Sequence, residues 1–139
     1  MSYALSAPLQ AAVYTALTQD ALLTGIIGDA IYDAMPPGEV PPIYVRLGAE
    51  TVRDTSDGTG AGAEHRFTVS VVSNAPGFAD AKAAAGAISD ALHDADLPLS
   101  RGRLVSLQFE RASARMVAAA QTRQIDLRFR ARVDDTVAP

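Results

Sequence analysis

A ten-residue segment near the end of the chain constrains the fold most strongly, because two kinds of side chain alternate along it. In QIDLRFRARV, from Gln124 to Val133, every second residue is apolar, and the residues between them are polar and include three arginines. Successive side chains of a β-strand point to opposite faces of a sheet. The segment therefore predicts a strand with one apolar face and one cationic face.

Similar patterns predict further strands and two main helices. The segments EHRFTVSVVS and RLVSLQFER alternate like strands, and shorter apolar runs at 31–33 and 43–47 flank a proline-rich loop that cannot be helical. Apolar residues recur at helical spacing from about Ala7 to Gln19 and from Phe78 to Leu92, with a short helical turn at 21–27. These helices are too few to cover both faces of a parallel sheet. We therefore predict an α+β fold: a mainly antiparallel sheet of four to five strands, with two main helices packed on one face.

The length of 139 residues predicts a single domain over residues 1–139. Small and polar residues dominate near 48–63 and near 112–122, and we expect flexible loops in both places. The sequence contains no cysteine, so disulfides, thiolate zinc sites and cysteine nucleophiles are excluded. The stability of the domain therefore has to come from its packed core.

The charge balance and the hydropathy of the chain exclude two classes of partner. The net charge is −4 and the pI is about 5.0, which lacks the basic footprint of a dedicated nucleic-acid-binding protein. No segment approaches the roughly 20 apolar residues of a membrane span, and the first residues lack the pattern of a signal peptide. We therefore expect a soluble protein that has neither free DNA nor a membrane as its main partner.

None of the motifs that could carry chemistry has the context it needs. The run DGTGAG leads into a strand and is not followed by Lys-Ser or Lys-Thr, which argues against phosphate binding. Asp54 and Asp57 lie in the same region but lack the alternating carboxylates of a calcium loop. His65 and His93 are interpreted as structural or surface residues, and no GxSxG segment supports a serine nucleophile. The sequence thus predicts no enzyme, no cofactor and no metal site.

The arginines of the last predicted strand have two interpretations. If helices cover one face of the sheet, Arg128, Arg130 and Arg132 point away from them and simply face solvent. Charged residues also lie on the other clear strands, and if those strands are neighbours the open face becomes a mosaic of arginines and carboxylates. Such a surface suits docking to a charged neighbour. The residues alone leave both interpretations open.

Four motifs are distinctive enough to be compared with known families. They are an Asp followed by a Gly-rich loop that ends in Glu-His-Arg (54–66), the Ala-Leu-His-Asp of 91–94, GRLV with a following FE (102–110), and the Arg-Phe-Arg-Ala of 128–131. Together they resemble the tail completion, or tail terminator, proteins of long-tailed phages and gene transfer agents. The resemblance spans nearly the whole chain, and it identifies a family without identifying an active site.

The resemblance implies a structural role in a virion. Proteins of this family form a ring, usually of six subunits, at the head-proximal end of the tail tube, where the ring stops tube polymerisation and joins the tail to neck or connector proteins. DNA would pass through the ring only as transient cargo, and assembly would take place in the bacterial cytoplasm. The candidates for contacts with a neighbouring subunit or another virion protein are Arg53, Asp54, Asp57, Glu64, Arg66, Glu110, Arg111, Arg128, Arg130 and Arg132.

A second class of function is compatible with the same residues. A stand-alone α+β binding module would use the open face of its sheet for an acidic peptide or a small ligand. The oligomeric state discriminates between the two classes. A monomer whose melting temperature rises with a ligand would favour the module, whereas rings that cap tail tubes would favour the structural role.

Overall fold

The computed structural model of the protein describes residues 3–35, 38–56 and 60–135 and confirms the predicted α+β class. Three helices and a five-stranded sheet make up this part of the chain. In chain order the elements are α1 (Ser6–Thr18), α2 (Ala21–Ile27), β1 (Ile31–Tyr32), β2 (Ile43–Asp54), β3 (Gly62–Ser73), α3 (Ala79–Leu92), β4 (Arg103–Val117), the 3-10 turn η1 (Ala118–Ala120) and β5 (Thr122–Asp134).

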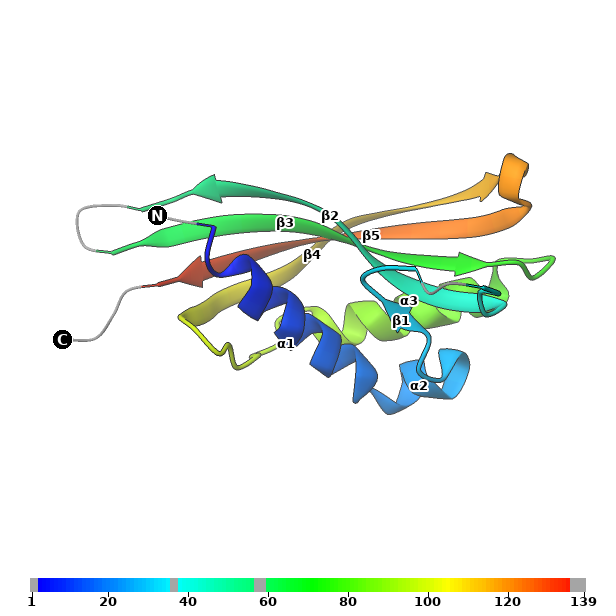
Figure 1. Cartoon of the computed structure of the whole chain (residues 1–139), viewed down its shortest axis with the longest axis horizontal. Coiled ribbons are helices and arrows are strands. Elements are labelled where there is room, and N and C mark those ends of the chain that lie inside the picture. Colours follow the sequence, from blue (N-terminus) through cyan, green and yellow to red (C-terminus); the bar gives the residue numbers. More distant parts are fainter. Residues whose placement is uncertain (1–2, 36–37, 57–59, 136–139) are drawn as a thin grey trace.

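The strands form one long, twisted sheet in the order β1-β2-β3-β5-β4 (Figure 1). All neighbouring strands are antiparallel except the short β1, which pairs in parallel with β2. Figure 1 shows α1, α2 and α3 packed together on one side of the sheet, while the other side carries no helix. The fold therefore has two layers, and one face of the sheet remains open.

The alternation of β5 explains where the core lies. Every second side chain of this strand is buried against the helices, and Phe129 at its centre is fully buried. Its ring stacks on Phe67 of β3 with 5.6 Å between ring centroids and meets Phe109 of β4 edge-on at 5.9 Å. Aromatic pairs at these separations add to the stability gained from burial. Strands β3, β5 and β4 are thus joined at one aromatic cluster.

The helices complete the core through one apolar side each. Helix α1 buries Leu9, Val13 and Leu17, while α3 buries several alanines together with Ile88 and Leu92. The small alanine side chains let the axis of α3 approach the sheet closely. Between them, α2 begins at Asp20, whose carboxylate accepts a hydrogen bond of 2.9 Å from the backbone N–H of Leu23. The apolar residues of α1 and α3 thus hold these helices against the sheet, and the cap at Asp20 sets the start of α2.

Both segments that were expected to be loops are largely strand. The pairing of β2 with β3 shifts register between Leu47 and Glu50, and β2 then continues to Asp54. This bulge breaks the alternation, so the sequence pattern hides the second half of the strand. Likewise, β4 pairs with β5 as far as Val117, but this half of the edge strand exposes small residues that carry no apolar alternation. Strand therefore replaces most of each predicted loop.

Gly102, immediately before β4, occupies a position that only glycine fits. Its φ is +68°, and a Cβ atom placed there would lie 2.6 Å from Cδ2 of Leu5 and 2.7 Å from the carbonyl oxygen of Asp134. Positive φ is costly for other residues, and both contacts are shorter than van der Waals separation. The glycine thus allows the start of β4 to pass close to the end of β5 and the first turn of the helical layer.

Candidate functional site

The side of the sheet that carries no helix is the candidate functional surface, and we call it the open face. Strand register aligns its side chains in rows that cross β2, β3, β5 and β4. One row reads Arg53, Glu64, Arg132 and Ser106, and the next reads Thr51, Arg66, Arg130 and Gln108. The open face consists of Tyr44, Arg46, Thr51, Arg53, Glu64, Arg66, Thr68, Ser70, Val72, Ser106, Gln108, Glu110, Arg111, Ser113, Arg115, Gln124, Asp126, Arg128, Arg130 and Arg132.

An ion-pair network occupies the middle of the open face. Arg66 lies between two carboxylates: its Nη1 is 2.5 Å from Oε1 of Glu64, and its Nε donates to Oε1 of Glu110 at 3.2 Å. The contact with Glu64 is an ion pair without hydrogen-bond alignment. Arg128 approaches Glu110 at 3.8 Å and Arg53 approaches Glu64 at the same distance. The predicted mosaic of arginines and carboxylates is therefore present.

Glu110 lies in this network next to an irregularity in the edge strand. The pairing of β4 with β5 shifts register between Phe109 and Arg111, which makes Glu110 the extra residue of a bulge. A bulge puts two successive residues opposite one residue of the partner strand, and here Glu110 and Arg111 both lie opposite Arg128. Glu110 lies between Arg66 and Arg128, where it can pair with both. Sequence alternation places Glu110 on the open face, because it follows the core residue Phe109, but the presence of Arg111 on the same face depends on the bulge.

Arginine side chains outnumber carboxylate side chains on the open face. Arg66 lies directly opposite Arg130 and Arg111 directly opposite Arg128, and like charges opposed across strands are destabilising. Arg130 donates to Oε1 of Gln108 at 2.7 Å, which satisfies hydrogen bonding but adds no negative charge. Within residues 3–35, 38–56 and 60–135, no hydrogen bond or ion pair involves the side chains of Arg46, Arg111 or Arg132. The surface thus carries positive charge that is not neutralised within this part of the chain.

Asp126 is held as an anion at the other end of the open face. Its carboxylate accepts hydrogen bonds from Gln124 at 2.9 Å, from Ser70 at 2.6 Å and from Arg115 at 2.5 Å. Burial by itself would raise the pKa of Asp126, but these three hydrogen bonds and the charge of Arg115 outweigh it, so the pKa lies below its ordinary value. The aspartate therefore neutralises one arginine of the surface at neutral pH.

One predicted site residue, Asp54, does not belong to the network. Asp54 ends β2, and its carboxylate accepts hydrogen bonds from the backbone N–H of Ser56 at 3.0 Å and from its hydroxyl at 2.6 Å. These bonds lower the pKa of Asp54 and form a local turn. Asp57 lies outside the described residues. The turn thus shapes the β2–β3 connection rather than the open face.

The helical side of the sheet contains a partly buried polar cluster that sequence reasoning missed. Glu50 accepts hydrogen bonds from the hydroxyls of Tyr3 and Ser6, the latter at 2.7 Å, and its Oε2 lies 3.0 Å from Nδ1 of the fully buried His65. Burial raises the pKa of Glu50, but the hydrogen bonds outweigh it and hold the pKa below its ordinary value. The cluster ties the start of α1 to β2 and β3.

Both histidines have the structural roles that were predicted for them. His65 belongs to the Glu50 cluster, and His93 at the end of α3 accepts a hydrogen bond of 3.1 Å at Nδ1 from the backbone N–H of Phe109. The following residue, Asp94, donates its backbone N–H to the carbonyl oxygen of Leu107 at 2.8 Å. The end of α3 is therefore fastened to β4. Among the described residues, no three His, Asp or Glu side chains gather where they could hold a metal ion.

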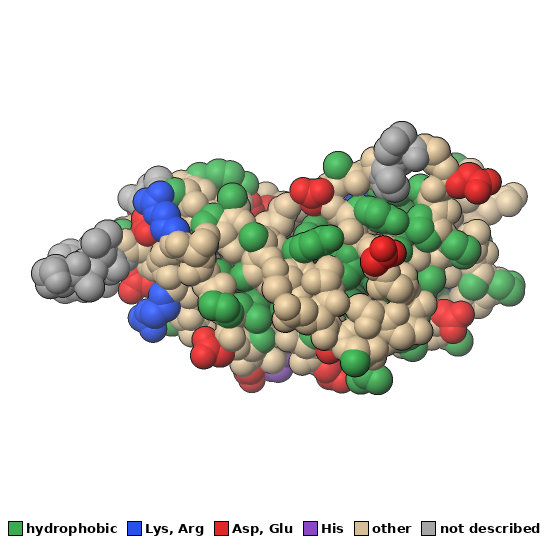
Figure 2. Space-filling model, turned by 60° about the horizontal axis from the view of Figure 1, so that its bottom comes forward, with side chains coloured by type: hydrophobic (Ala, Val, Ile, Leu, Met, Phe, Trp, Pro, Cys, Tyr) green, Lys and Arg blue, Asp and Glu red, His purple; other side chains and the backbone are tan. Residues whose placement is uncertain are grey.

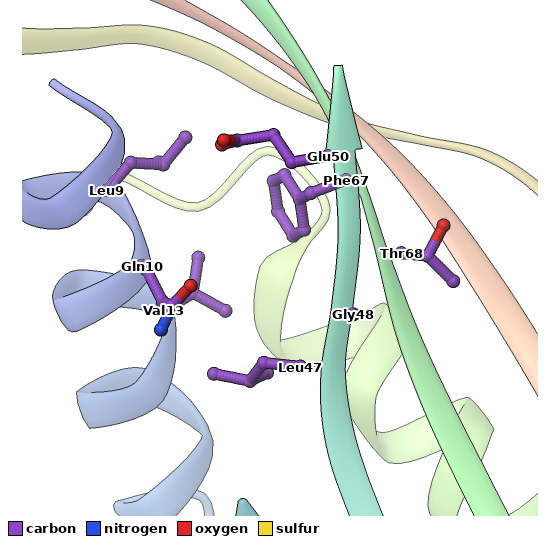
Figure 3. Close-up of a pocket in the computed structure, with 8 residues that line it drawn as sticks. All are labelled: Leu9, Gln10, Val13, Leu47, Gly48, Glu50, Phe67 and Thr68. Carbon is purple, nitrogen blue, oxygen red and sulfur yellow. The ribbon is translucent and has the colours of Figure 1, made fainter. Parts of the chain in front are cut away.

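One pocket between α1 and the sheet, beside Glu50, is small. Figure 3 shows Leu9 and Val13 of α1 facing Leu47 and Phe67 across it, with the carboxylate of Glu50 at one end. Its volume is about 30 Å³, which is about the share of one water molecule in the liquid. This pocket is therefore too small for a metabolite, whereas wider hollows of about 540 and 420 Å³ lie along α1. None of the helices in the described ranges is long and apolar enough to cross a membrane.

The fold and its open face define a domain that resembles structural components of virus-like tails, and comparisons with known proteins support this class. The family model described as tail completion protein gp17 matches residues 11–134. The chain belongs to this family, as its sequence motifs predicted. A solved chain from the "Virion of native gene transfer agent (GTA) particle" is 60% identical, with a TM-score of 0.91, and the match covers 96% of this chain and 99% of that chain. No curated protein matches.

Proposed function

We propose that the protein is a tail terminator: a ring of six copies at the head-proximal end of the tail tube that stops tube polymerisation and joins the tail to neck proteins. The observation that carries this proposal is the match, over nearly the full length of both chains, to a component of a gene transfer agent virion. Membership of the tail completion family supports it independently. The activity requires no catalytic residue, because a terminator works by occupying a surface.

The residues of the open face are our candidates for the contacts that build the ring and attach it to its neighbours. Each protomer of a closed ring presents two different, complementary patches, and a polar surface with charges of both signs supplies specificity for such contacts. We further propose that the β2–β3 connection, which includes Asp54 and Asp57, contacts the tail tube or the neck. DNA passes through the ring as transient cargo during particle function.

Deletion of the gene tests the proposed function. Without a terminator, tube growth has no stop and the tail has no junction with the head. Electron microscopy of the deletion strain should show tails of irregular, greater length and heads without tails, and the wild-type gene supplied in trans should restore normal particles. Tails of normal length joined to heads in the deletion strain would refute the proposal.

A further inference from the structure

Positive and negative charges are segregated between the two layers of the fold. The open face holds eight arginines and three carboxylates. Since the whole chain has 12 Lys and Arg and 16 Asp and Glu, the remainder holds four basic and thirteen acidic side chains. A protein of net charge −4 therefore has one strongly basic face, and the rest of the chain is strongly acidic.

Exposed carboxylates of the helical layer lie on α3 and in the connection that follows it. Asp80 and Asp90 are exposed on α3, and Asp96 is exposed in the connection that follows it. Across the three helices, as the structure describes them, Lys82 is the one basic residue. Figure 2 views the molecule from the helical side and shows acidic side chains along its whole length, whereas Lys and Arg appear only at one end. The two faces are thus opposite in sign and lie on opposite sides of the domain.

We propose that in the ring the basic open face of each copy packs against the acidic helical face of the next copy. The inference rests on the proposed function, since it assigns the two patches that a closed ring requires. A ring made from one kind of subunit needs a heterologous contact, in which a surface meets a different and complementary surface. The segregated charges provide both surfaces on one chain.

The unpaired arginines of the open face favour the acidic helical face of another copy as the partner. Arg46, Arg111 and Arg132 have no internal partner within the described residues, and carboxylates from a neighbouring copy would neutralise them. The same carboxylates would relieve the repulsion between arginines opposed across strands. Nucleic acid phosphates could also neutralise arginines, but an overall charge of −4 opposes the approach of DNA to the molecule.

Two charge-reversed variants and their mixture test the assignment. A sheet variant carries Arg111→Glu and Arg132→Glu, because these two arginines make no hydrogen bond or ion pair within the described residues. A helix variant carries Asp90→Arg and Asp96→Arg. Each variant alone places like charges opposite one another where its substituted residues meet the next copy. When the two are expressed together, the new glutamates on the sheet of one copy meet the new arginines on the helical side of the next. At the other contacts native arginines meet native aspartates, so an alternating ring becomes possible.

The assay is the production of normal-length, joined tails in the deletion strain, with circular dichroism melting as the check on folding. Each variant alone should fail to restore tails, and co-expression should restore them. A control carrying Arg111→Lys and Arg132→Lys, which keeps the charge, should function alone. Normal tails with either variant alone would overturn the inference. Failure of the co-expressed pair to restore tails would overturn it too, and this failure is the result expected if the open face contacts DNA. A deletion strain with normal tails would instead overturn the proposed function itself.

Discussion

Replacement of Phe129 by alanine is expected to lower the free energy of unfolding by about 3–5 kcal/mol, the range for removing a buried phenylalanine side chain. Phe129 is fully buried and joins β5 to its two neighbouring strands through its contacts with Phe67 and Phe109. The variant loses both the apolar burial and the aromatic pairs, and it leaves a cavity between sheet and helices. Urea unfolding followed by circular dichroism at neutral pH measures the difference.

Val105→Ala provides the matched control for this prediction. Val105 also lies in the sheet, on the edge strand β4, but it is 50% exposed. Substitutions at exposed positions usually change stability by within about 0.5 kcal/mol. If the Phe129 and Val105 variants lose similar amounts of stability, the core does not lie where the structure places it.

Glu50→Ala should give the second large loss of stability, about 1–3 kcal/mol at pH 7, the cost of leaving a buried polar partner unsatisfied. The substitution removes the acceptor for Tyr3 and Ser6 and leaves the ring of His65, which is fully buried, without its partner at Nδ1. The Nε2 atom of this ring already lacks a hydrogen bond within the described structure. Glu39→Ala, at an exposed position, is the control and should leave stability nearly unchanged.

The effect of Glu50→Ala should depend on pH, because the pKa of Glu50 is lower in the folded state than in the unfolded state. A carboxylate of this kind stabilises the fold fully above its unfolded pKa, near the ordinary value of 4.5, and the contribution disappears as pH falls through the lower folded pKa. The stability difference between wild type and variant should therefore be largest above pH 4.5 and shrink in stronger acid. A difference that stays constant from neutral pH into strong acid would contradict this assignment of the ionised state.

The alternating segments and helical spacings predicted the class of fold because burial alone creates those patterns. Phe129 and the arginines beside it illustrate this, since every second side chain of β5 is buried, as the sequence indicated. The later halves of β2 and β4 could not be predicted in the same way. A bulge shifts the register of β2, and the exposed small residues of β4 give no apolar signal, so neither half resembles a strand in sequence.

The candidate surface was only partly predictable for a related reason. Alternation placed Arg66, Arg128 and Glu110 off the core, and the register shows that both arginines lie beside Glu110. The bulge that also brings Arg111 to this face has no signal in the sequence pattern. The Glu50 cluster was missed because its members lie far apart in the sequence and Glu50 falls in a segment that was expected to be a loop. The segregation of charge between two faces also emerges only when the strand order is known.

The central claim is that this chain acts as a building block at the junction between tail and head. Cryo-electron microscopy of purified particles tests it most directly, because the long single-sided sheet and its three helices should be recognisable in density. The account predicts a closed ring of copies of this fold at the head-proximal end of the tail tube. Particles with intact head–tail junctions from which this fold is absent would contradict the claim.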